Sequence, residues 1–472
     1  MVKVKASHHD SSERSTAVPI LTALPSPHEF HAKYVAQREP VVIRNGWPSL
    51  LKSPTQDASA PSAIPTMPTV ESLRSLVKET ATIEVNHRPN DAASYSPAES
   101  RVEQMAWGDF LRHILDDNTN NHYYMTTQTL PIENEEGRPA ICTTPVTELF
   151  GCTTNNILAA IPPRPALLGH LVPATWNVWI GKTAPPSTSS SSGWHHDYHD
   201  NLYCVWQGCK HLELLPPASI LQRVSTVGTL SQLYPNGRIV YEEQGGSQQI
   251  RADGALVSVD RLHQLEQERD RILEEIEASE TNCTGSRPTA KATKQDLEAQ
   301  LERVEEEILS IEYEDDSEEE EEGDECQLFG ATTTRPDEDS DEHNGVSRSD
   351  HQNPPSNKRA KLNEDGGDRY GEVSPNGHLP INFVTHMDEA SLSPQTVSLS
   401  RGDLLYLPAG WFHNVSSSGG VHMAFNYWFH PPDAPSFDQP YLSTFWERDW
   451  AERFPSGSPR RSLHGDGASD QK

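Results

Sequence analysis

The chain has 472 residues, enough for one large domain or two of ordinary size. Only 34% of the residues are hydrophobic and 37 are proline, so we expect part of the length to remain unfolded. The formal net charge of −31, without a basic stripe, argues against direct binding to nucleic acid. No apolar run approaches the ~18 residues that a membrane span needs, and the polar N-terminus does not read as a secretory signal.

The chain alternates short strand patterns with turn signals over two separate stretches. Residues 1–17 are polar, and we expect them to be disordered. Strand-like runs occur at 41–43, 82–85, 123–125, 176–180, 201–205 and 211–215, and again at 381–384, 395–400, 404–407 and 421–429. We therefore predict one mainly β domain, formed by residues 18–258 and 376–455, with an insertion between them and a loose tail over 456–472.

The predicted insertion has a helical part and an acidic part. Within 259–311 the apolar residues follow a heptad pattern, most clearly at Leu297, Leu301, Val304, Ile308 and Ile311. This pattern fits a paired helical hairpin or coiled coil, and it fits equally well two solvated helices with a weak apolar seam. Residues 263–375 carry 34 acidic and 12 basic side chains, a net charge of −22. We expect residues 312–375, which include the nearly unbroken acidic block, to be disordered.

A basic cluster lies inside the acidic part of the insertion. Lys358, Arg359 and Lys361 follow two prolines in a segment that we expect to be exposed. Such a cluster is typical of a nuclear-import signal, although a chance basic group in a long loop would look the same. We therefore expect a nuclear protein that also occurs in the cytoplasm.

Two short motifs suggest a metal site. His195 and Asp197 are two residues apart, so on a strand their side chains point to the same side. His413 follows a Pro-Ala-Gly turn at the start of another strand pattern. Two imidazoles and one carboxylate form the facial triad of mononuclear Fe(II) oxygenases. An H-x-D triplet alone is weak support, but the second motif strengthens the interpretation.

Together, these motifs resemble the JmjC family, in the cupin-like branch that includes the factor-inhibiting-HIF asparaginyl hydroxylase. The matching segments are HHDYHDNLY at 195–203, GCKHLELLPP at 208–217, GDLLYLPAGWFHNV at 402–415, PVVIRNGWP at 40–48 and NVWIGK at 177–182. The resemblance covers about 20–258 and 376–432. It implies a double-stranded β-helix (jelly roll) with flanking helices, and an enzyme that uses Fe(II) and 2-oxoglutarate.

The resemblance also implies residues that contact the co-substrate. Lys210, fifteen residues after His195, matches the lysine that pairs with the distal carboxylate of 2-oxoglutarate. The expected pairing is physically sound, because a dianion in a partly closed barrel needs a cation opposite its free carboxylate. Asn201 and Asn426 match two further polar residues of that pocket.

Two hydroxyl groups complete the implied contacts. Ser192, three residues before His195, matches a serine or threonine that touches the same carboxylate. Tyr124 matches a tyrosine hydroxyl there, and Tyr123 is the alternative. His413 lies 218 residues after His195, but without the 113 residues of 263–375 the spacing falls to 105, close to that of the family. Such an insertion is tolerable because loop-closure entropy grows only logarithmically with length.

Three functions compete on these grounds. The branch resembled implies hydroxylation of a protein side chain. A JmjC histone lysine demethylase is the alternative, although no zinc-finger or chromatin-reader motif is present. The third is a non-catalytic nuclear scaffold that binds histones or other basic proteins through the acidic insertion. The family also includes dimers built from C-terminal helices, and 441–454 is the segment of this chain that would form such a homodimer helix.

Overall fold

The computed structural model forms two compact units. The first comprises Met1–Ala255 and Gly367–Lys472, and the second comprises Leu256–Gly366. The described residues are 17–51, 67–74, 78–87, 101–116, 123–126, 161–183, 190–217, 223–245, 249–281, 294–324, 380–388 and 392–454. The basic cluster at 358–361, most of the predicted disordered segments and the tail lie outside these ranges. No helix within them is long and apolar enough to cross a membrane.

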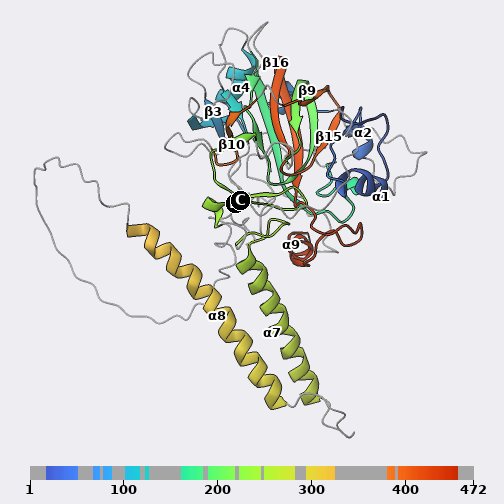
Figure 1. Cartoon of the computed structure of the whole chain (residues 1–472). Helices are drawn as coiled ribbons and strands as arrows, with labels where there is room; N and C mark the ends of the chain where they lie inside the picture. Colours follow the sequence, from blue (N-terminus) through green and yellow to red (C-terminus); the bar gives the residue numbers. More distant parts are fainter. Residues whose placement is uncertain are drawn as a thin grey trace, which may run out of the picture. The chain divides into compact units, whose positions relative to one another are not determined.

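The first unit is mainly β (Figure 1). Its largest sheet has twelve strands, in the order β1-β2-β15-β9-β16-β6-β5-β3-β4, with β14 on β9 and with β7 and β8 on β16. The strands are β1 (Ile20–Leu21), β2 (Val41–Ile43), β3 (Thr82–His87), β4 (Arg101–Ala106), β5 (Tyr123–Met125), β6 (Pro173–Lys182), β7 (Ser190–Ser191), β8 (His195–His196), β9 (Asp200–Leu215), β14 (Gln395–Leu399), β15 (Leu404–Leu407) and β16 (Phe412–Phe429). Two small antiparallel ribbons pair β10 (Val224–Thr226) with β13 (Val384–Met387), and β11 (Leu230–Leu233) with β12 (Ile239–Tyr241).

Two long strands, β9 and β16, belong to both layers of the barrel. The first half of β9 pairs with β15, and its second half pairs with β14. The second half of β16 pairs with β6, and its first half pairs with β7 and β8. Both strands change layer at glycines with positive φ, Gly208 in β9 and Gly419-Gly420 in β16, where the β9–β16 register shifts. This wrapping is the jelly roll that the sequence predicted.

Side-chain alternation along β16 separates the core from the barrel interior. Phe425, Tyr427 and Phe429 join a large apolar cluster that also contains Trp47 and Trp206. The residues between them, Asn426 and Trp428, therefore face the opposite side, which is the inside of the barrel. Short helical segments surround this framework: α1 (Pro27–Phe30), a π-helix (His31–Val35), α2 (Trp47–Leu50), α3 (Val70–Leu73), α4 (Trp107–Leu115), two 3₁₀ turns (Ala166–Leu168 and Glu242–Gln244) and α9 (Phe445–Arg453).

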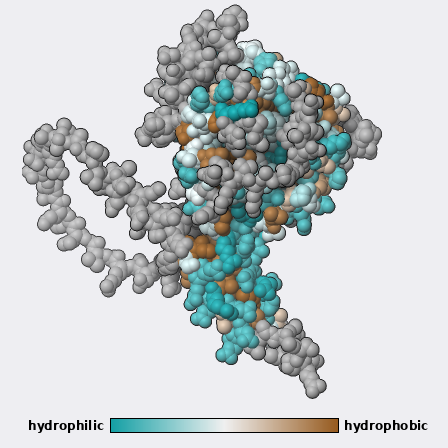
Figure 2. Space-filling view, in the orientation of Figure 1, coloured by the Kyte–Doolittle hydropathy of each residue, from teal (hydrophilic) through white to brown (hydrophobic). Residues whose placement is uncertain are grey.

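The second unit is a helical hairpin of α7 (Val257–Thr281) and α8 (Lys294–Asp324). A buried seam of Leu262, Leu265, Ile272, Leu297, Val304 and Ile308 joins the two helices. Of the two arrangements that the heptad pattern allowed, the structure has the paired one. Hydrophilic residues cover most of the visible hairpin surface (Figure 2). We expected disorder from residue 312, but α8 continues to Asp324, in line with the high helix propensity of glutamate.

The turn before His413 provides a test of the fold. Gly410 has φ of +76°, and a Cβ added there would collide with the carbonyl oxygen of Gly237. Gly419 has φ of +87°, but nothing lies within 4 Å of its added Cβ. We expect Gly410→Ala to lower the free energy of unfolding by about 3 kcal/mol and Gly419→Ala by about 1 kcal/mol, since only the first combines backbone strain with overpacking. Urea denaturation measures both, and equal losses would contradict the close approach at Gly410.

Candidate metal centre

The barrel brings the three predicted metal ligands together. His195 is the first residue of β8, and Asp197 follows β8 by one residue. His413 lies opposite His195 in the antiparallel pairing of β8 with β16. All three side chains are buried, and each offers a ligand atom within 4.8 Å of the other two. Residues that are 218 positions apart in the sequence thus converge on one point.

Hydrogen bonds to the backbone orient both imidazoles. The Nδ1 atom of His195 lies 2.9 Å from the carbonyl oxygen of Gly193, and that of His413 lies 2.9 Å from the carbonyl oxygen of Trp411. A carbonyl oxygen only accepts, so Nδ1 carries the proton in each ring and Nε2 carries the lone pair. Metal-binding histidines characteristically donate their other ring nitrogen in this way.

The electrostatics of the triad suit a divalent metal ion. Oδ1 of Asp197 lies 3.4 Å from Nε2 of His413 and 4.0 Å from Nε2 of His195. Burial, with a smaller contribution from His413, lowers the pKa of His195 well below its ordinary value. The imidazole is therefore neutral at physiological pH, which is the form that binds metal. Two imidazoles and one carboxylate match the donor set of an Fe(II) site.

A line of amide side chains leads from the barrel wall to Asp197. Nε1 of Trp179 donates to Oδ1 of Asn426 at 2.8 Å, and Nδ2 of Asn426 donates to Oδ1 of Asn201 at 3.1 Å. Nδ2 of Asn201 in turn donates to Oδ2 of Asp197 at 3.2 Å. Asn201 thus bonds the carboxylate ligand and Asn426 bonds Asn201, while the co-substrate contacts of both residues stay a prediction.

Lys210 is buried inside the barrel among hydroxyl groups. It is 1% exposed, and its Nζ donates to Oγ of Ser417 at 2.6 Å and to the hydroxyl of Tyr124 at 3.4 Å. Burial lowers the pKa of Lys210 to about 7. Of the two candidate tyrosines, Tyr124 is the one beside Lys210, since Tyr123 stacks on His87 with ring centroids 4.6 Å apart.

The serine beside Lys210 is not the one predicted. Oγ of Ser192 donates to the carbonyl oxygen of Gly193 at 3.0 Å and accepts from the backbone N–H of Val415 at 2.9 Å. These bonds fasten the loop before His195 to β16. Ser417 occupies the place beside Lys210 because the two residues are paired across β9 and β16. To predict Ser417 from the sequence, one would have had to know the register in which β9 pairs with β16.

The neighbouring histidines lie outside the triad. His196 points to the other side of β8, where its Nε2 lies 2.7 Å from the hydroxyl of Tyr241. His199 stacks against Trp428 with ring centroids 5.9 Å apart. Strand alternation separates His196 from His195, whereas His199 lies in the turn between β8 and β9.

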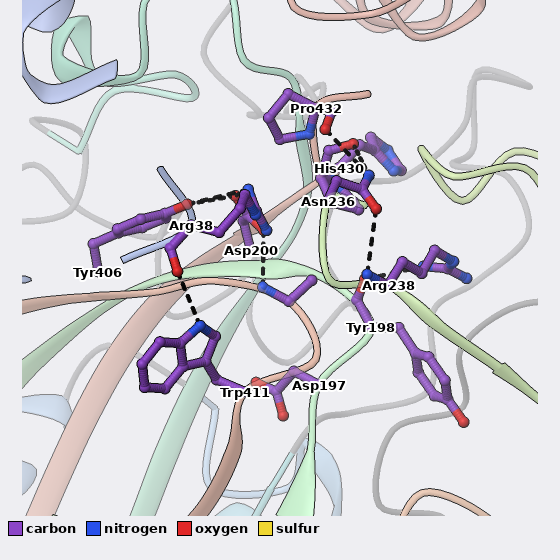
Figure 3. A network of polar contacts seen from close by, with 12 residues as sticks. Arg38, Asp197, Tyr198, Asp200, Asn236, Arg238, Tyr406, Trp411, His430 and Pro432 are labelled. Atoms are coloured by element: carbon purple, nitrogen blue, oxygen red, sulfur yellow. Dashed lines mark hydrogen bonds and ion pairs between the residues drawn. The ribbon is translucent and has the colours of Figure 1, made fainter. Parts of the chain in front are cut away.

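A buried ion pair joins the two ligand-bearing segments (Figure 3). Asp200 is fully buried and accepts from Nη1 of Arg38 at 2.8 Å and from the hydroxyl of Tyr406 at 2.8 Å. It also accepts from the backbone N–H of Ala409 at 2.9 Å. Burial is the largest single effect and lowers the pKa of Arg38, but the charge and hydrogen bond of Asp200, together with Tyr406 and Tyr441, raise it above its ordinary value.

The same network reaches the turn before His413. Nε1 of Trp411 donates to the carbonyl oxygen of Arg38 at 3.0 Å, and the N–H of Gly410 donates to the carbonyl oxygen of Asp197 at 2.9 Å. The loop carrying Asp197 and the turn preceding His413 are thus bonded to each other and to Arg38. The sequence analysis missed this network because its members are far apart along the chain.

Comparison with known proteins agrees with this architecture and site. The family model described as a cupin-like domain matches residues 27–434. The chain therefore belongs to the cupin-like JmjC family, a family of oxygenases of the Fe(II) and 2-oxoglutarate type. Among individual proteins it is similar to "JmjC domain-containing protein 4" of Schizosaccharomyces pombe (strain 972 / ATCC 24843). The two are 31% identical over 470 residues, which is 92% of this chain and 89% of the relative.

The buried ion pair generates a stability prediction. Asp200→Asn keeps the size of the side chain but leaves the guanidinium of Arg38 without its counter-charge. We expect a loss of about 3–5 kcal/mol in the free energy of unfolding, measured by urea denaturation. The control is Glu307→Gln in the exposed Arg261–Glu307 pair, which we expect to cost about 1 kcal/mol or less. Equal losses of unfolding free energy in the two variants would mean that water solvates the guanidinium of Arg38 once its counter-charge is removed.

The buried lysine generates a prediction about pH. The folded protein releases the Lys210 proton near pH 7, whereas the unfolded chain keeps it to about pH 10.5. Stability contributed by this site therefore rises as the pH increases between these values. Without metal and co-substrate, Lys210→Met should be more stable than the wild type at pH 7 and below, and this gain should shrink toward pH 10. Exposed Lys78→Met is the control, and a gain independent of pH would contradict burial of the charge.

Proposed function

We propose that the protein is an Fe(II)- and 2-oxoglutarate-dependent dioxygenase that hydroxylates a side chain of a protein substrate. The observation that carries the proposal is a buried lysine, Lys210 on β9, that bonds the strand carrying His413. His413 and Ser417 lie four residues apart on β16, about 13 Å along one side of the strand, and Ser417 bonds Lys210. A five-carbon diacid suits this distance when a metal ion at one end and an ammonium group at the other bind its charges.

Each residue of the site has a distinct part in the proposed reaction. His195, Asp197 and His413 would hold the iron, leaving other coordination positions for the keto acid and for O2. The bound iron would supply the oxidation of an unreactive C–H bond, coupled to decarboxylation of 2-oxoglutarate to succinate.

The remaining residues bind and orient. The ammonium of Lys210 would form a charge-assisted bond with the distal carboxylate of 2-oxoglutarate, supported by the hydroxyls of Tyr124 and Ser417. That carboxylate would also favour the charged form of Lys210. Asn201 donates to Oδ2 of Asp197, a bond that orients the carboxylate and would leave Oδ1 available to the metal.

The substrate class rests on family membership. The sequence resembles the branch of side-chain hydroxylases, and that resemblance supports a protein substrate. The same oxidation at an N-methyl carbon would release formaldehyde, so the substrate decides between hydroxylation and demethylation. Nuclear localisation, homodimer formation and binding of basic partners through the acidic insertion stay predictions from the sequence.

Anaerobic titration with Fe(II) and 2-oxoglutarate tests the proposal directly. A keto acid chelated to Fe(II) gives a visible charge-transfer band, and we expect this band in the wild type. His413→Ala should abolish the band, because this substitution removes a metal ligand. Lys210→Ala should weaken the band, because loss of the charged partner lowers the affinity for 2-oxoglutarate by about tenfold or more.

The matched control for the titration is His386→Ala, a histidine that is exposed on β13. It should leave the band unchanged. A well-folded wild type without a band, or a His413→Ala variant with the full band, would rule out this chemistry and favour the scaffold function.

A further inference from the structure

The first described residues after the insertion contact the strand that carries His195. We call residues 380–384 the return segment. Phe383 forms an isolated antiparallel bridge with His195, and the N–H of Val384 donates to the carbonyl oxygen of Trp194 at 3.0 Å. Nδ2 of the buried Asn382 donates to the carbonyl oxygen of His196 at 2.6 Å. The return segment is thus bonded to residues on both sides of the metal ligand.

Phe383 stacks on the imidazole of His195. The ring centroids are 4.8 Å apart and the planes are inclined by only 10°. The ring of His413 lies 4.3 Å from that of His195, at 56°. His195 is therefore held by an aromatic ring at its face, by the second histidine and by the Nδ1 bond to Gly193. Together these contacts restrict rotation of the imidazole about its side-chain bonds.

Phe383 is itself held in place from a second direction. The backbone N–H of Val227 donates to the carbonyl oxygen of Phe383 at 2.9 Å, and that of Gly228 donates to Ile381 at 2.9 Å. The N–H of Phe383 donates to the carbonyl oxygen of Pro380 at 3.0 Å, which closes a turn. The return segment lies between β8 and the residues after β10, so its backbone is fixed although the Phe383 ring is only partly buried.

We propose that Phe383 is a positioning residue that fixes the ring of His195 for metal binding and shields it from water. The inference rests on the proposed metal site, but it does not depend on 2-oxoglutarate or on a substrate. Groups that orient a metal ligand from behind contribute to affinity because a loose ligand loses entropy when the metal binds. Here an apolar ring acts in addition to the usual hydrogen-bond acceptor, the carbonyl oxygen of Gly193.

Titration with Co(II) alone tests the proposal, because this coloured ion accepts the same imidazole and carboxylate ligands. We expect Phe383→Ala and Phe383→Leu to raise the dissociation constant about tenfold and to change the visible Co(II) spectrum. Leucine keeps most of the apolar bulk but not the flat ring. Phe383→Tyr keeps the ring, and we expect it to bind Co(II) within about twofold of the wild type.

Phe437→Ala is the matched control. Phe437 is also a partly exposed phenylalanine that contacts histidine rings, those of His28, His31 and His170, and none of these is a triad residue. We expect its Co(II) affinity and spectrum to equal those of the wild type. If Phe383→Ala does not fold by circular dichroism, the comparison of Phe383→Leu with Phe383→Tyr decides.

The outcomes separate this inference from the proposed function. Wild-type affinity and spectrum in Phe383→Leu, and in folded Phe383→Ala, would overturn the positioning role and leave the metal site intact. Equal weakening by Phe437→Ala would overturn it too, by showing a general effect of lost packing. Failure of the wild type to bind Co(II), or binding that survives His413→Ala, would overturn the metal site and the inference together.

Discussion

The ion pair of Asp200 with Arg38 is the interaction on which the metal centre depends. The pair is buried. Asp200 is the first residue of β9, and its carboxylate accepts from the backbone N–H of Ala409 in the turn that precedes β16. Replacing either charge would leave the other in a site with little water, which is strongly unfavourable. The pair thus couples the N-terminal segment to both loops that supply metal ligands. The backbone of Arg38 is in the left-handed region, with φ of +56°, which is unfavourable for a residue other than glycine.

The inside of the barrel is divided between two kinds of chemistry. At one end, two imidazoles and a carboxylate offer ligand atoms for a cation. At the other end lies the amine of Lys210, and burial lowers the pKa of this group to about 7. Amide side chains of Asn201 and Asn426 connect the first end to the wall. A ligand with a negative charge at each end complements this arrangement better than a neutral one, because each buried centre lacks a full counter-charge.

The sequence predicted the features that local patterns encode. Alternation predicted a mainly β domain, the family resemblance implied the jelly roll, and the heptads left paired and solvated helices equally open. Short motifs predicted the three metal-ligand candidates, and the structure brings His195, Asp197 and His413 together. Contacts between distant segments were not predictable in this way. Ser417 was overlooked in favour of Ser192, because only strand pairing places it on Lys210. The contact of Phe383 with His195 was missed for the same reason, since an insertion separates them.

The long separation between the two halves of the metal centre has a consequence during synthesis. The ribosome must add 218 residues after His195 before His413 exists, which takes about 10–40 s at ordinary elongation rates. During this time β6 and β9 have been made but lack β16, so their edges are open to wrong pairing. The acidic insertion, residues 263–375, makes up 113 of the residues translated in that interval, and its like charges would keep the unfinished chain apart from other copies.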